Sequence, residues 1–185
     1  LEDSVMSGTV NIGFAYRGPS DPLALLAGRS VGIYWGDSSQ PLGLPEPSSS
    51  LAIDRLFMQL TGRAGFSDPL GTELSPILKR STAIHLGSDT ILATGPSDTF
   101  DLTPGSFSGQ PGNGMIPGTN RYWYWVELEI YPAATGSIKL FVNNSSTPVI
   151  DYAGDTRGIG NSEVIDFIGF RMNNSQGMGL WLDDI

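Results

Sequence analysis

The sequence contains no cysteine and only one histidine, His85, among its 185 residues. Without cysteine there can be no disulfide framework, no cysteine-ligated zinc site and no thiol nucleophile. His85 alternates within a strand-like segment, and no serine lies in a Gly-x-Ser-x-Gly motif, so a Ser-His-Asp arrangement is not expected. A chain of this length should bury roughly 70% of the surface of its unfolded form, so its stability requires neither metal nor disulfide.

Basic residues are also scarce, because 10 Lys and Arg stand against 19 Asp and Glu, for a formal net charge of −9. This charge repels phosphate backbones and anionic membrane surfaces, so neither nucleic acid nor membrane is expected as a partner. No apolar run approaches the roughly 18 residues that span a bilayer. The sequence begins at Leu1 without an initiator Met and stops at Ile185 inside a strand-like segment. We expect one soluble domain over residues 1–185 whose extreme termini are missing.

What the sequence does contain is 24 Gly and 13 Pro, scattered between short segments in which apolar residues alternate with polar ones. Period-two alternation is typical of strands with one buried face. The clearest segments are 125–130 and 137–142, joined by a turn at 132–136, and their inward faces are expected to hold Val126, Leu128, Ile130, Ile138, Leu140 and Val142. The resulting hairpin places Glu129 opposite Lys139 and Glu127 opposite Phe141.

Eight further segments have the same strand-like character, which gives about ten strands in all. They are residues 10–16, 31–35, 52–60, 77–86, 90–94, 149–152, 164–172 and 179–185. Segment 52–60 is also compatible with a short helix, but Thr61-Gly62 would end that helix early, so a strand is favoured. So many short strands leave no room for the long crossovers of a parallel α/β sheet. The sequence therefore predicts an all-β, two-sheet antiparallel sandwich.

Two long segments rich in Gly, Pro and Ser, 36–50 and 104–118, are predicted to be loops that serve either as plain connectors or as binding surfaces. In the second, an apolar pair stands among turn residues, and an exposed apolar pair suits a partner surface. The alternative is that the pair folds back onto the domain's own core. We predict that residues 110–120 bind another protein, with contacts from Asn113, Met115, Ile116 and Pro117.

Aromatic side chains offer a second candidate surface, because an aromatic ring can stack on the apolar face of a sugar. Trp35 and Trp123 are the candidate sugar contacts. Neighbouring residues of the aromatic run 122–125 must point alternately, so at least one Trp of this run is expected in the core. Core packing is the alternative interpretation for each of these rings.

Acidic residues are candidates for catalysis and for metal binding. Glycoside hydrolysis with retention needs two carboxylates about 5–5.5 Å apart. Glu127 and Glu129 are the only alternating pair and would lie within roughly 7 Å of each other on one strand face. Solvated outer-face charges are the favoured interpretation, so no catalytic residue is assigned. Oxygen-rich groups suit Ca²⁺, but no EF-hand spacing exists, and no metal or cofactor is assigned; a calcium site would draw on Asp151, Asp155, Asp166, Asp183 and Asp184.

The C-terminal third resembles the concanavalin A-like, or laminin G-like, jelly-roll family, especially the versions found in virion proteins of tailed bacteriophages. The resemblance covers about 65 residues and lies in the segments YWYWVELEI (122–130), GSIKLFV (136–142), VIDYAGDT (149–156) and WLDDI (181–185). Two departures stand out. Asn143-Asn144-Ser145 replaces the family's tight Asp-Gly turn, and Trp125 replaces the first of the three alternating acids of the laminarinase-type relatives.

The resemblance implies a jelly-roll, concanavalin A-like fold more firmly than it implies a function, because members act as lectins, glycosidases, adhesion modules, capsid decorations and fibre domains. The expected function is that of a non-enzymatic virion structural protein, a capsid decoration, cement or fibre-type domain assembled in the host cytoplasm. Its partners would be further copies of itself or shell and tail neighbours. The alternative is a carbohydrate-binding, lectin-like module that recognises surface glycans.

Overall fold

A computed structural model of the chain describes residues 8–17, 30–39, 55–62, 75–81, 90–96, 99–100, 123–158, 161–173 and 181–183. All ten elements assigned there are strands: β1 (Val10–Arg17), β2 (Ser30–Gly36), β3 (Arg55–Gly62), β4 (Ile77–Ser81), β5 (Thr90–Thr94), β6 (Tyr124–Tyr131), β7 (Gly136–Val142), β8 (Ile150–Gly154), β9 (Phe167–Asn173) and β10 (Trp181–Asp183). The described part contains no helix of the length and apolarity that a bilayer span requires.

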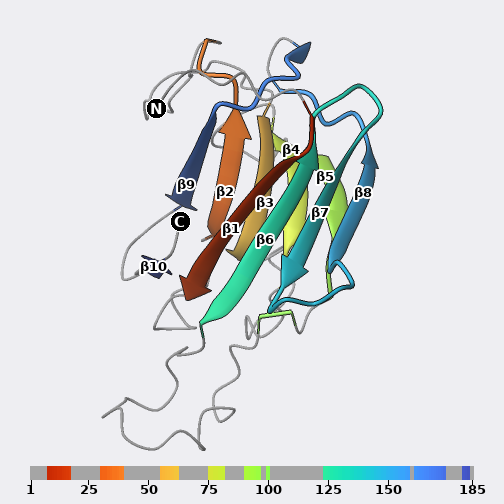
Figure 1. Cartoon of the computed structure of the whole chain (residues 1–185). Coiled ribbons are helices and arrows are strands. Elements are labelled where there is room, and N and C mark those ends of the chain that lie inside the picture. The colour runs from red at the N-terminus through yellow and green to blue at the C-terminus, as the bar shows by residue number, and fades with distance from the viewer. Residues whose placement is uncertain are drawn as a thin grey trace, which may run out of the picture.

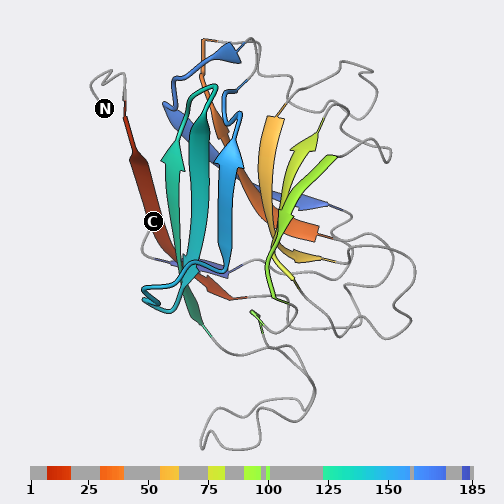
Figure 2. The same ribbon diagram turned by 90° about the vertical axis from the view of Figure 1, so that its right-hand side faces the viewer.

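The strands form two five-stranded sheets that lie face to face, as Figures 1 and 2 show. The first sheet has the order β10-β1-β6-β7-β8, and the second has the order β5-β4-β3-β2-β9. Every strand pair in both sheets is antiparallel. The prediction of an all-β, two-sheet antiparallel sandwich is confirmed.

The core lies between the sheets and is built by alternation along each strand. The six inward residues predicted for the β6–β7 hairpin, Val126, Leu128, Ile130, Ile138, Leu140 and Val142, are all buried. Across the interior, the ring of Phe14 on β1 meets that of Phe170 on β9 edge to face, with centroids 5.2 Å apart. Such an edge-to-face pair stabilises the contact between the two sheets beyond the contribution of its buried apolar area.

The predicted pairing of the hairpin is also confirmed, because Glu129 lies opposite Lys139 and Glu127 opposite Phe141. Strands β6, β7 and β8 follow one another as a meander. The segment for which a helix had been an alternative is strand β3, so the helix interpretation is wrong. Strand β4 ends at Ser81, short of the predicted end at residue 86, and residues 82–89 lie outside the described part.

Candidate functional site

The solvent-facing side of the sheet β10-β1-β6-β7-β8, here called the outer face, brings polar side chains of four strands into register. One cross-strand row runs from Asn11 on β1 through Glu129 and Lys139 to Asp151 on β8. The adjacent row runs from Gly13 through Glu127 to Phe141. These residues share one face because partners directly opposite each other in an antiparallel sheet point the same way. The alternation that buries the hydrophobic core therefore also assembles this surface.

Both glutamates of the outer face have a partner in the sheet itself. The ammonium of Lys139 donates a hydrogen bond to Oε1 of Glu129 over 2.6 Å. This hydrogen bond is the main cause that raises the pKa of Lys139 above its ordinary value, and the charge of Asp151 adds to it. The indole Nε1 of Trp125 donates to Oε1 of Glu127. Each glutamate of this pair is therefore held by one neighbouring side chain of the same face.

A shallow depression of about 480 Å³ lies on the outer face between β1, β6 and β7. Its lining combines carboxylates, an amide, a hydroxyl and an aromatic ring, from Asn11, Ile12, Gly13, Glu127, Leu128, Glu129, Phe141 and Ser145. Gly13 lets the indole of Trp125 lie on β1, because a Cβ at this position would be only 3.0 Å from Cζ2 of that ring. We call this region the outer-face depression. An apolar ring beside hydrogen-bonding groups is a common composition for sugar-binding surfaces.

The two candidate sugar contacts have opposite environments. Trp35 is only 4% exposed and belongs to the core between the sheets, so its ring has no face to offer a ligand. This removes Trp35 from the candidates, because its position on β2 points into the sandwich. Trp123, directly before β6, is 46% exposed. The candidate partner-binding residues Asn113, Met115, Ile116 and Pro117 lie outside the described residues.

The aspartates considered for calcium are not brought together. Asp151 lies on β8 and Asp183 on β10, at opposite edges of one sheet. Asp155 binds Arg157, while Asp166 accepts hydrogen bonds from the backbone N–H and hydroxyl of Ser38. Within the described ranges, no group of three or more acidic or histidine side chains could hold a metal ion. Asp184 lies outside those ranges.

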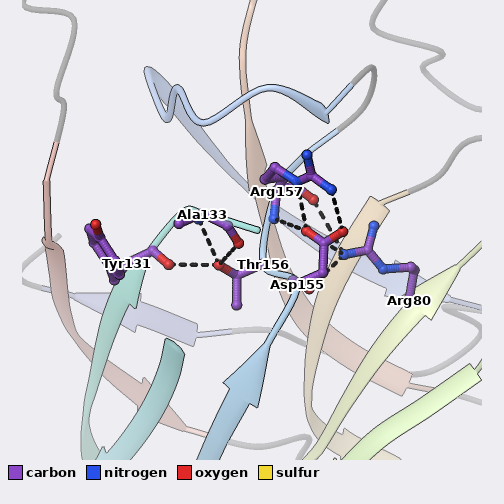
Figure 3. Close-up of polar contacts among 6 residues, drawn as sticks. All are labelled: Arg80, Tyr131, Ala133, Asp155, Thr156 and Arg157. Atoms are coloured by element: carbon purple, nitrogen blue, oxygen red, sulfur yellow. Dashed lines mark hydrogen bonds and ion pairs between the residues drawn. The ribbon is translucent and has the colours of Figure 1, made fainter. Parts of the chain in front are cut away.

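A polar corner that the sequence did not predict follows directly after β8 (Figure 3). The buried hydroxyl of Thr156 donates to the carbonyl of Tyr131 over 2.6 Å and accepts the N–H of Ala133 over 3.0 Å. The backbone N–H of Thr156 donates to the carbonyl of Ala133 over 3.0 Å. One threonine thus fastens the end of β8 to the turn between β6 and β7.

The residues on either side of Thr156 connect the two sheets. The guanidinium of Arg157 binds the carboxylate of Asp155 through both oxygens, over 2.9 and 2.8 Å. Arg80 reaches across from β4 of the other sheet and donates to the carbonyls of Asp155 and Arg157 over 2.8 and 3.4 Å. The hydrogen bond from Arg157 is the main cause that lowers the pKa of Asp155 far below its ordinary value. The segment Gly154-Asp155-Thr156 could be identified in the sequence as part of the resemblance. Its contact with Arg80, 75 residues earlier in the chain, could not be predicted.

Comparisons with protein-family models, with curated proteins and with solved structures returned no match.

Proposed function

We propose that the chain is a structural module of a tailed-phage virion, a capsid decoration, cement or fibre-type domain that acts through contacts with neighbouring proteins and is assembled in the host cytoplasm. The proposal includes the finer fold assignment, a concanavalin A-like jelly roll. The observation that carries it is the β6–β7–β8 meander, which contains three of the four segments of the resemblance. Within it, the Asp155-Thr156 step has a defined task, since it fastens β8 to the β6–β7 turn.

The proposal of a non-enzymatic role is supported by the state of the only alternating acid pair. Glu127 accepts a hydrogen bond from Trp125 and Glu129 accepts one from Lys139, and Trp125 occupies the position of the first of the three alternating acids of the laminarinase-type relatives. Assays against β-glucans and galactans test this point. Turnover that disappears in Glu127→Gln would show that the module is an enzyme.

The experiment that tests the proposed function is co-purification with assembled particles and measurement of the copy number per particle. A fixed copy number in intact particles is expected, and a protein found only free in the lysate would contradict the proposal. The predicted contact at residues 110–120 is tested in the same assay. Replacing Met115 and Ile116 by Ser should lower incorporation while leaving the melting temperature of the isolated domain nearly unchanged. Unfolding of this variant would instead show that the pair belongs to the core.

A second candidate function, a carbohydrate-binding module for surface glycans, is favoured by the outer-face depression. Phe141 and the ring of Trp125 supply apolar area, and Asn11 and Ser145 supply polar groups beside it. Binding to immobilised glycans that is lost in Phe141→Ala but kept in Tyr131→Ala would support this candidate. Tyr131 is a suitable control because it is 45% exposed at the far end of β6 and does not line the depression.

A further inference from the structure

Strand β1 is paired along its whole length on one side but only along part of its length on the other. Strand β6 pairs with residues from Val10 to Tyr16, whereas β10 pairs only with Ala15, Tyr16 and Arg17. Among the residues that the structure describes, no strand pairs with Val10–Phe14 on the side away from β6. Among the described strands, this part of β1 forms an edge of the first sheet, and we call it the open edge; Figure 2 shows β1 in red at the left of the sheet.

The hydrogen-bonding groups at the open edge can be assigned from the rest of the sheet. The N–H and C=O of Trp125 bind Asn143 on the β7 side of β6. Because backbone groups point alternately to the two neighbours of a strand, those of Val126 and Leu128 face β1 and pair with Phe14 and Ile12. The N–H and C=O groups of Asn11 and Gly13 are therefore directed at the open edge. They are spaced as a further antiparallel strand would need them.

The sequence of the open edge lacks two of the features by which proteins block strand addition, charged side chains and proline. Val10–Phe14 reads Val-Asn-Ile-Gly-Phe, with no charge and no proline. Core coverage differs along β1, since Val10 and Ile12 are each 8% exposed, whereas Phe14 and Tyr16, nearer to β10, are 0% exposed. An added strand with apolar residues opposite Val10 and Ile12 would complete the coverage that β10 provides further along. The opposite edge of the sandwich differs from the open edge. There Gly95, directly after β5 of the second sheet, packs against Val149, directly before β8 of the first sheet.

The charge beside the open edge specifies the outward residues of such a strand. Asn11 and Gly13 line the outer-face depression together with Glu127 and Glu129. The described side chains of the outer face include three carboxylates but only one ammonium group. The carboxylates are those of Glu127, Glu129 and Asp151, and the ammonium group is that of Lys139. A basic side chain between two apolar ones would reach this acidic surface from the edge.

We propose that the open edge of β1 binds an extended segment of a neighbouring protein as an additional antiparallel strand, and that this segment alternates apolar with basic residues. Main-chain hydrogen bonds to Asn11 and Gly13 would provide affinity, and the alternating side chains would provide specificity. The inference rests on the proposed function, since it names the kind of contact through which the module joins its neighbours.

The test uses a short, capped synthetic peptide in which Val and Lys alternate, and a control peptide with the same residues in two blocks. In the protein alone, amide hydrogen exchange should be fast at Asn11 and Gly13 and slow at Ile12 and Phe14, which bind β6. The alternating peptide should slow exchange at Asn11 and Gly13, and the block peptide should not. Protection of Asn11 and Gly13 in the protein alone would overturn the inference, because the edge would already be occupied.

The matched variants are Asn11→Pro and Asn11→Ala. Proline removes only an N–H that points away from β6, so the fold should tolerate it as edge strands do. We expect Asn11→Pro to weaken peptide binding about tenfold or more, because a hydrogen bond is lost and the ring blocks the approach. Asn11→Ala, which keeps the N–H, should bind as the unchanged protein does. Equal binding of the peptide by the two variants would mean that the peptide binds elsewhere on the protein. If the protein forms a concentration-dependent dimer that Asn11→Pro dissociates, the open edge binds a second copy of the chain instead.

Particle incorporation separates this inference from the proposed function. If the unchanged protein does not co-purify with particles, the proposed function fails whatever the peptide does. If it co-purifies and Asn11→Pro is incorporated as well as Asn11→Ala, the open edge is not the assembly contact and this inference fails alone.

Discussion

At the scale of single residues, Thr156 connects the end of β8 to the turn between β6 and β7 through its hydroxyl. Its hydroxyl satisfies the carbonyl of Tyr131 and the N–H of Ala133 at a buried corner. Thr156→Val keeps the shape but removes the donor to the Tyr131 carbonyl and the acceptor for the Ala133 N–H, so it should lower the free energy of unfolding by about 1–3 kcal/mol, measured by urea denaturation. Thr156→Ser, which keeps the hydroxyl, is the control and should lose clearly less. Equal losses would mean that the methyl group contributes as much to the corner as the hydroxyl does.

The tryptophans mark the limit of residue-level prediction. Alternation places neighbouring residues of a strand on opposite faces, but it does not reveal which face of an isolated segment meets the core. In β2, Trp35 has the same parity as Val31 and Ile33, but the opposite face holds Gly32 and Tyr34 and no charged residue, so alternation alone marks the inward face only weakly. The ring is buried because it lies on the face of β2 that packs against the first sheet, a neighbourhood that only the whole fold defines. Trp123 lies directly before β6, so the alternation within the strand does not determine where its side chain points.

At the scale of elements, the β6–β7 hairpin is the part that the sequence predicts best. Its strands alternate without interruption and a short turn joins them, so local information fixes both the register and the inward face. The partners of β1 could not be predicted in this way. Strands β6 and β10 lie more than a hundred residues further along the chain, and no local pattern encodes such a pairing. The same holds for the acidic outer face, which exists only once β1, β6 and β7 are side by side.

The hairpin's inward face can be tested at Leu128, which is 1% exposed. Leu128→Ala should cost about 2–5 kcal/mol of unfolding free energy, because it removes buried apolar area and leaves a cavity. Tyr131→Ala, at an outward and 45% exposed position of the same strand, is the matched control and should cost much less. A loss below ~0.5 kcal/mol for Leu128→Ala, against the usual range for such sites, would mean that the core lies on the other face.

At the scale of the whole molecule, the corner after β8 is where polar contacts tie the two sheets together. Arg80 of the second sheet donates to the carbonyls of Asp155 and Arg157 in the first, and its guanidinium also lies 4.0 Å from the Asp155 carboxylate. The hydrophobic core holds the sheets face to face without directional preference. Hydrogen bonds of fixed geometry add a constraint on how β4 and β8 align, and they do so at one end of the sandwich.

This corner should make stability depend on pH. Arg157 and Arg80 lower the pKa of Asp155 below its ordinary value of 3.8. A carboxyl whose pKa is lower in the folded than in the unfolded protein stabilises the fold fully above the ordinary value, and this contribution is lost as the pH falls below it. The free energy of unfolding should therefore fall more steeply below pH 3.8 in the unchanged protein than in Asp155→Asn, with a constant difference between the two well above that pH. Asp151→Asn removes the same charge from an exposed position on β8, opposite Lys139 on the outer face, and is the control. Denaturant titrations of the three proteins across this range decide the matter, and parallel curves for Asp155→Asn and the unchanged protein would show that the Asp155 contacts contribute nothing to the joining of the sheets.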